Sequence, residues 1–288
     1  MRSAQGGIGM IEFKDVHMSY DGIRPILKGL NFMIADGDFV AFVGTNGAGK
    51  STAMRLINGL LKPDAGEVLI DGVATTQLKT SELARRVGFL FQNPDRQICC
   101  SSVREELLFG FKAQDSVDEQ AHKRVQAACE EFGLSPDDDP FLLNRGARQL
   151  LALASVVVMA PPVVVLDEPT TGLDFRECER VMHVVKRLNE AGTTVIMVCH
   201  DMEVVADYAT RCLVMHDGQL IGEGPTFSIL RNRTLLIEAS LMPPQVVDIA
   251  LRLSDEMPAL ASSQVCQANT LDEMIAATHD YLRTRKAD

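Results

Sequence analysis

With 288 residues, the chain is long enough for one large α/β domain and a small appended one. It carries 28 basic and 39 acidic residues, a net charge of −11, which argues against nonspecific nucleic-acid binding through a broad basic face, though not against a local basic groove. Seven cysteines without a CxxC pair indicate thiols in a reducing compartment, most of them small core residues rather than ligands.

The first predicted strands begin near residue 10. Residues 1–9 contain no apolar core of a signal peptide, and we expect a disordered lead-in there. After them, apolar patches predict strands, and a DG turn at Asp36-Gly37 leads into the last patch. The predicted strands are Ile11–Phe13, Asn31–Ile34 and Phe39–Val43.

A helix and further strands follow these patches. Gly44 opens a glycine-rich loop, and apolar residues with helical spacing begin at Lys50. The segments GEVLIDG and VGFLFQ, residues 66–72 and 87–92, are predicted strands. From about residue 101 to 160 the pattern is helical, with a loop at SPDDDP.

One apolar run, residues 150–166, resembles a membrane span because Ser155 is its only polar residue. Pro161-Pro162 would break such a helix, and two carboxylates follow the run at once. We therefore expect a soluble chain with a buried helix, a turn and a β-branched strand at Val163–Leu166, of the kind found in parallel sheets.

A strand at Thr194–Cys199 and a hairpin with a DG turn at Asp217-Gly218 complete the predicted sheet. The order of elements predicts an α/β fold with a helical insertion between two parts of one sheet. We expect one domain over residues 10–225, with the helical subdomain at about 93–162.

Beyond residue 225 the composition favours a small C-terminal helical domain, residues 226–288. Two helices are predicted in it, and the second begins at the capping box Thr270-x-x-Glu273. The first follows Pro243-Pro244 and places on one face Val246, Ile249, Ala250 and Leu253.

The glycine-rich loop matches the phosphate-binding pattern G-x-x-x-x-G-K-[ST] between a strand and a helix. Its glycines let backbone N–H groups turn toward phosphate oxygens, and the helix N-terminus adds positive potential. Lys50 would hold the β- and γ-phosphates of ATP, Ser51 a Mg²⁺ ion and Thr52 a further phosphate oxygen. A turn without a ligand is the alternative. The residues around the phosphates are Gly44, Thr45, Asn46, Gly47, Ala48, Gly49, Lys50, Ser51 and Thr52.

Adjacent carboxylates end the buried strand VVVLDE. Asp167 suits a Mg²⁺ shell, and Glu168 suits a base that orients or deprotonates an attacking water. The alternative, two acids that solvate a strand end, is disfavoured by the phosphate-binding loop in the same predicted sheet.

Two more polar side chains end predicted strands. His200 follows TVIMVC, and Gln92 ends VGFLFQ. Ligand chemistry gathers at the carboxyl ends of parallel strands, so we expect His200 at the γ-phosphate and Gln92 near Mg²⁺ or the attacking water. A structural histidine and a polar strand-end residue are the alternatives.

Tyr20, one of three tyrosines, follows the first strand. Its ring could stack on adenine, because an aromatic face holds a base without reading its edges. A tyrosine that packs on the surface is an equal alternative.

In this order, the phosphate-binding loop, Gln92, VVVLDEP, TGLD and CHD resemble the nucleotide-binding subunit of ATP-binding cassette (ABC) transporters over residues 10–225. FQNPDRQ and MPPQVVDIALRLS resemble in particular the energy-coupling-factor and cobalt-importer ATPases. The resemblance implies an ABC ATPase core with a mixed sheet, a helical signature subdomain and a C-terminal helical domain.

The same resemblance implies a dimer with two ATPs. Each ATP would lie between the phosphate-binding loop (P-loop) of one subunit and the signature turn, here residues 143–147, of the other. Tyr20 would stack on adenine, Gln92 would sense Mg²⁺ and contact the membrane subunit, and Asp174 would bridge the two sites. ATP binding would close the dimer and hydrolysis reopen it, with the C-terminal helices adding contacts. The expected partners are a second ATPase subunit, a transmembrane coupling subunit and a substrate-binding membrane subunit, at the cytoplasmic face of the membrane.

The signature turn departs from the family's L-S-G-G-Q, because residues 143–147 read LNRGA. Asn144 suits a helix N-cap and carries an NH₂ donor, while Gly146 would leave its backbone N–H accessible to phosphate. Arg145 and Arg148 add positive charge, although Arg148 could simply be solvated. Leu150 stands where a basic residue is usual. Losing one preorganised donor costs about 3 kcal/mol, so an altered donor predicts a weakened site rather than a dead one.

An intact phosphate-binding loop beside an altered signature suggests that the chain pairs with a different, homologous ATPase subunit, and a homodimer is the alternative. The weakened site would then contain the partner's P-loop, because signatures act across the dimer. We expect a motor for import of a vitamin or metal ion. The alternatives are a soluble ABC ATPase, which usually needs tandem cassettes or a coiled coil, and a nucleotide switch with little turnover.

Overall fold

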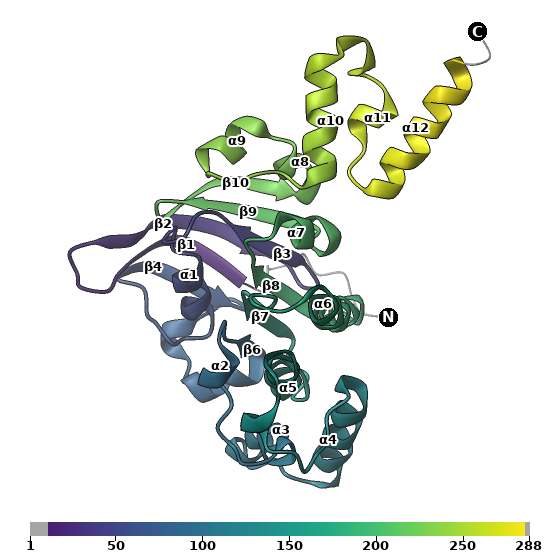
Figure 1. The fold of residues 1–288 in the computed structure, drawn as a ribbon. Helices are drawn as coiled ribbons and strands as arrows, with labels where there is room; N and C mark the ends of the chain where they lie inside the picture. The colour runs from purple at the N-terminus through teal and green to yellow at the C-terminus, as the bar shows by residue number, and fades with distance from the viewer. Residues whose placement is uncertain (1–10, 286–288) are drawn as a thin grey trace, which may run out of the picture.

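The computed structural model describes residues 11–285, and the lead-in predicted for residues 1–9 lies outside them. Two sheets form the body of the molecule (Figure 1). The first is antiparallel, with the strand order β2-β1-β4-β5. Its strands are β1 (Ile11–Ser19), β2 (Pro25–Ile34), β4 (Ala65–Ile70) and β5 (Val73–Ala74).

Strands β1 and β2 are longer than the apolar patches that predicted them. Polar residues such as Lys14 and His17 belong to β1 because its backbone pairs with β2 on one side and β4 on the other. These backbone hydrogen bonds do not depend on the polarity of the side chains.

The second sheet has the order β10-β9-β3-β8-β7-β6. Neighbours from β9 to β6 run parallel, and β10 pairs antiparallel with β9, so the sheet is mixed, as predicted. A DG hairpin turn with positive φ at Asp217 and Gly218 joins β9 to β10. The strands are β3 (Phe39–Val43), β6 (Val87–Leu90), β7 (Val163–Asp167), β8 (Thr194–Val198), β9 (Arg211–His216) and β10 (Gln219–Pro225).

Two hydrophobic cores lie on opposite faces of this sheet. On β3, Phe39, Ala41 and Val43 point into one core, while Val40 and Phe42 point into the other. The first core contains the helical segment, and the second contains the antiparallel sheet and α1 (Lys50–Ile57). Because β3, β7 and β8 are parallel and fully buried, their carboxyl ends meet at one edge.

The segment between β6 and β7 is helical, as predicted. The main helices are α3 (Val103–Ala113), α4 (Glu119–Phe132) and α5 (Arg145–Val157). The same segment contains the short helices η2 (Pro94–Arg96) and η3 (Pro140–Leu142), while η1 (Thr75–Gln77) and α2 (Thr80–Arg86) precede β6. The apolar run 150–166 contains the end of α5, a turn and β7. Within residues 11–285, no helix combines the length and apolar character that a membrane crossing requires.

Helices α6 (Phe175–Glu190) and α7 (Met202–Tyr208) precede and follow β8. The C-terminal region contains more helices than the two predicted, because several are too short to show a periodic pattern. They are α8 (Thr226–Leu230), α9 (Arg233–Glu238), α10 (Gln245–Glu256), η4 (Pro258–Leu260), α11 (Gln264–Gln267) and α12 (Leu271–Arg285).

The predicted capping box of α12 is present, with Glu273 N donating to Thr270 Oγ1 and Thr270 N to Glu273 Oε2. The predicted apolar face of α10 is wrong in part. Ala250 is buried, but Val247 is buried in place of Val246, and Ile249 is 47% exposed. Helical spacing alone cannot show which of two adjacent apolar stripes meets the neighbouring α11.

Candidate functional site

The glycine-rich loop leads from β3 into α1, where the sequence predicted it. Gly49 is the N-cap of α1 in a left-handed conformation, and no side chain caps this helix. The first N–H groups of α1 are therefore available to an anion. Gly44 also requires glycine, because its φ is 141° and a Cβ atom would collide with the carbonyl oxygen of Met215.

Lys50 bends back across the loop. Its Nζ donates to the carbonyl oxygens of Gly44, at 2.7 Å, and Thr45, at 2.9 Å, and the residue is only 5% exposed. Burial lowers the pKa of Lys50, while the nearby charges of Glu168 and Asp167 oppose that shift. A buried ammonium beside N–H groups suits the charge of a polyphosphate.

Ser51 and Asp167 meet beneath the loop. Ser51 Oγ donates to Asp167 Oδ1 at 3.0 Å, and Asp167 is 6% exposed. Burial raises the pKa of this carboxyl against the opposing hydrogen bond from Ser51. A buried carboxylate beside a hydroxyl supplies the hard oxygen ligands that Mg²⁺ prefers, so these two of the three predicted metal ligands fit the ion.

Glu168 is held by three side chains that come from different loops. Its Oε2 accepts hydrogen bonds from Gln92 Nε2, at 2.7 Å, and Thr171 Oγ1, at 2.9 Å. Its Oε1 lies 2.8 Å from His200 Nε2. The backbone at Glu168 has a φ of 51°, a strained conformation for a residue with a side chain. The structure thus brings the three predicted catalytic residues together around one carboxylate.

A cavity of about 240 Å³ lies beside these groups and is lined by Tyr20, the loop, Glu168 and His200. Tyr20 is 57% exposed, and its hydroxyl lies 3.1 Å from Thr52 Oγ1. The ring therefore stands next to the phosphate-binding loop, where it can meet the base of a nucleotide. We call this space the nucleotide cavity.

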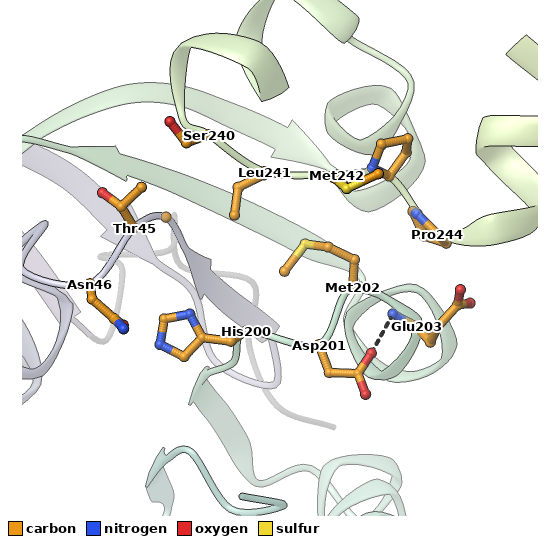
Figure 2. A pocket seen from close by; sticks show the side chains of 12 residues that line it. Thr45, Asn46, His200, Asp201, Met202, Glu203, Ser240, Leu241, Met242 and Pro244 are labelled. Carbon is orange, nitrogen blue, oxygen red and sulfur yellow. Dashed lines mark hydrogen bonds between the residues drawn. The ribbon is translucent and has the colours of Figure 1, made fainter. Parts of the chain in front are cut away.

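A second cavity, of about 530 Å³, opens on the other side of His200. Figure 2 shows Thr45, Asn46 and His200 facing Ser240, Leu241 and Met242, which belong to the loop between α9 and α10. The backbone N–H of Gln245 donates to Glu203 Oε1 at 2.7 Å and fixes this loop beside α7. Sequence reasoning missed residues 240–244, because Pro243-Pro244 signals only a helix boundary.

Asn144 caps α5, as predicted, with its Oδ1 accepting a hydrogen bond from Ala147 N at 2.8 Å. The expectation that Gly146 presents its backbone N–H to a partner's phosphate stays a prediction. Gly146 is buried because Glu177 of α6 packs over it, and a Cβ atom there would collide with Glu177 Oε1. Asp174 and Glu177 form the capping box of α6. Neither Asn144, Gly146 nor Asp174 lines the nucleotide cavity of its own chain.

Two arginines tie the first turn of α5 to loops of the same chain. Arg145 NH2 donates to the carbonyl oxygen of Thr171 at 3.0 Å and covers Gly172. Arg148 forms an ion pair with Asp95 at 2.8 Å and is not a freely solvated charge. The buried Gln149 adds a bond from its Nε2 to the carbonyl oxygen of Pro169, at 3.0 Å.

These contacts connect the signature turn, residues 143–147, and the helix that follows it to the loops that carry Gln92 and Glu168. The partners Asp95, Gln149, Thr171 and Glu177 were missed by sequence reasoning, since nothing in a one-dimensional pattern marks which polar side chain a loop will meet.

Comparison with known families gives two matches. A family model described as ABC transporter matches residues 27–171, which is half of the chain. A model described as AAA domain, putative AbiEii toxin, Type IV TA system, matches the shorter segment 139–206.

Two curated relatives that differ in length are similar to the chain. A putative ABC transporter ATP-binding protein, TTE1589 of Caldanaerobacter subterraneus, is 40% identical over 88% of this chain, which spans 45% of that relative's length. The energy-coupling factor transporter ATP-binding protein EcfA of Methanothermobacter thermautotrophicus is 38% identical over 85% of this chain and 80% of its own.

Solved structures share the fold. The structure of cbiO1 from Clostridium perfringens, described as part of the ABC transporter complex cbiONQ, is 28% identical with a TM-score of 0.72, over 88% of this chain and 97% of that one. The dimeric ATP-binding cassette MJ0796 bound to ADP and Pi is 31% identical with a TM-score of 0.66, over 75% of this chain and 99% of that one.

Replacing Asp167 with Asn should raise the thermal unfolding midpoint of the nucleotide-free, Mg²⁺-free protein at neutral pH. The folded-state pKa of Asp167 lies above its unfolded value, so ionised Asp167 destabilises the fold at any pH above that raised pKa. The advantage of the variant should therefore be absent in acid, grow as pH rises from the unfolded-state pKa to the raised one, and stay constant above it.

Thermal melts of Asp167→Asn and wild type from about pH 4 to pH 8 measure this difference. The exposed Asp36→Asn, which has the same chemistry, is the control and should melt like the wild type. A variant that is less stable than wild type at neutral pH would contradict the burial argument.

Proposed function

The chain belongs to the family of ABC transporter ATP-binding proteins, which bind and hydrolyse ATP, and we propose that it powers a membrane importer of a vitamin or metal ion. The observation that carries the proposal is the nucleotide cavity, where the P-loop, Glu168 and His200 converge. The similarity to EcfA and to cbiO1 supports an importer of the energy-coupling-factor type.

Binding of ATP would use the groups that the loop presents. The free N–H groups of α1 and the buried Lys50 meet the phosphates, and Tyr20 stacks on adenine. Ser51 and Asp167 would hold Mg²⁺, with Gln92 as a further ligand, and the ion would supply positive charge to the β- and γ-phosphate oxygens.

Hydrolysis would require Glu168 Oε1 to exchange its contact with His200 for one with the attacking water. His200 Nε2 now lies against Glu168 Oε1. When a γ-phosphate enters the cavity, His200 would donate to its oxygen, which frees Oε1 to accept a proton from the attacking water. Gln92 and Thr171 keep Oε2 in place during this exchange, so the carboxylate remains aimed at the water.

A second ATPase subunit would complete each site. Asn144 uses Oδ1 to cap α5 and keeps its NH₂ group for the partner's γ-phosphate, while Gly146 is buried. The signature turn therefore offers the γ-phosphate fewer hydrogen-bond donors than the family pattern does. This supports a weakened site wherever this chain supplies the signature. We therefore favour a heterodimer, peripheral to the cytoplasmic face of the membrane, with a transmembrane coupling subunit and a substrate-binding membrane subunit. The intact Glu168 arrangement disfavours a switch with little turnover.

Glu168→Gln should lower ATP turnover of the assembled complex about 100-fold or more, because a positioned base contributes roughly 10²–10⁴ in rate. ATP binding should persist, since the phosphate-binding groups are unchanged. Turnover and nucleotide affinity of the variant, with the exposed Glu190→Gln as the matched control, test this expectation. Full turnover in Glu168→Gln would refute the role of Glu168.

Pairing with a full-strength partner predicts unequal effects of the two catalytic carboxylates. This chain's Glu168 faces the partner's intact signature, so Glu168→Gln should remove most turnover, and the same change in the partner should remove little. The measurement compares both single variants in the co-purified complex. Equal losses would contradict the asymmetry.

Arg145→Ala should reduce turnover about fivefold, because loss of a hydrogen bond worth about 1 kcal/mol releases Thr171, which orients Glu168. Thr171→Val should reduce it similarly, and the double variant should lose less than the product of the two effects. The exposed Arg176→Ala is the control. Multiplicative losses would show that Arg145 does not act through Thr171.

A further inference from the structure

Two adjacent cysteines and a buried glutamate come together away from the nucleotide cavity. Cys99 and Cys100 lie in the loop between η2 and α3, and Glu106 lies in α3. The Sγ atoms of both thiols and a carboxylate oxygen of Glu106 lie within 4.8 Å of one another. Cys99 is exposed and Cys100 half-buried, in contrast to the core role expected of most cysteines.

The fold holds this cluster in place. Glu106 is 3% exposed, and its Oε2 accepts hydrogen bonds from the backbone N–H groups of Cys99 and Cys100, both at 2.9 Å. Ser102 caps α3 through Glu105 N, so the loop enters the helix in one conformation. The carboxylate that orders the loop therefore also faces the two thiols.

We propose that Cys99, Cys100 and Glu106 form a binding site for a thiophilic divalent cation with the preferences of Zn²⁺. Zinc binds thiolate sulfur at about 2.3 Å and carboxylate oxygen at about 2.1 Å, which places tetrahedral ligand atoms about 3.5–3.8 Å apart. The three ligand atoms lie within 4.8 Å of one another, so they would have to draw closer around an ion. Three protein ligands leave a fourth position for water, and the exposure of Cys99 opens that position to solvent.

Binding would replace protons by the ion. Burial, and then the charge of Glu106, raises the pKa of Cys100 to about 12, so the metal-free thiol is protonated at neutral pH. One M²⁺ would displace one proton from each thiol and leave two thiolates and the carboxylate around the ion.

The proposed metal site lies in the loop that follows Gln92, so a bound ion would restrain that loop; this consequence rests on the proposed function. A bound ion would fasten residues 99–100 to α3. These residues belong to the segment 92–102 that joins β6 to α3. Gln92 at its start donates to Glu168, and Asp95 pairs with Arg148 of α5. The ion would thus restrain the loop that carries a catalytic side chain.

Titration of the reduced, nucleotide-free full chain with Cd²⁺ tests the site without any measurement of ATP turnover. We expect a thiolate-to-metal charge-transfer band that saturates at one ion per chain, and an excess of Zn²⁺ should compete with Cd²⁺ for the site and reduce the band. Cys99→Ser/Cys100→Ser should lose the band, whereas Cys178→Ser, a partly buried thiol outside the cluster, should keep it. Glu106→Gln, which retains an acceptor for the two backbone N–H groups, should bind at least tenfold more weakly.

Three outcomes would overturn the proposal. They are a wild type without a saturable band, a Cys99→Ser/Cys100→Ser variant that keeps it, and a Glu106→Gln variant with unchanged affinity. Circular dichroism and ATP binding confirm that each variant is folded. Because the titration uses no nucleotide, its failure is independent of a failure of the proposed ATPase function.

Discussion

The adjacent carboxylates of Asp167 and Glu168 at the end of β7 impose the constraint on which the site depends. Two negative charges at the end of a buried strand are unfavourable unless donors or cations surround them. Ser51 donates to Asp167, and Gln92, Thr171 and His200 surround Glu168. The loops after β3, β6, β7 and β8 therefore converge on one strand end. A Mg²⁺ ion bound with the nucleotide would bring positive charge to these carboxylates, so metal binding would offset part of the electrostatic cost that is built into the fold.

The first turn of α5 extends this convergence to a second surface. Its outward side presents Asn144, and its inward side holds Arg145 and Arg148 against the loops of Glu168 and Gln92. The helix start that we propose to face a partner's nucleotide is thereby joined to the loop of Glu168 in its own chain. This arrangement gives the altered signature letters a structural role within the subunit, since Arg145 serves the neighbouring loop as well as the helix terminus.

Gly146 has a neighbour that its sequence position does not indicate. A glycine near a helix N-terminus suggests an open backbone N–H, and in the structure the Glu177 carboxylate also occupies the space that a Cβ atom would take. The cysteines show the same dependence. Seven cysteines without a CxxC pair predict mostly small core residues, yet the loop before α3 places the thiols of Cys99 and Cys100 against Glu106. In each case the deciding neighbour lies on another element.

The sequence by itself determined the α/β class, the phosphate-binding loop and the strand-end positions of Asp167, Glu168 and His200. These features follow from local rules, because glycine spacing, β-branched runs and the polarity of strand ends act over a few residues. Tertiary structure alone decided which side chains hold Glu168, which stripe of α10 is buried, and that residues 240–244 border the P-loop. Such contacts join residues far apart in the chain, and they are set by how the two sheets and the helices pack, which no local pattern encodes.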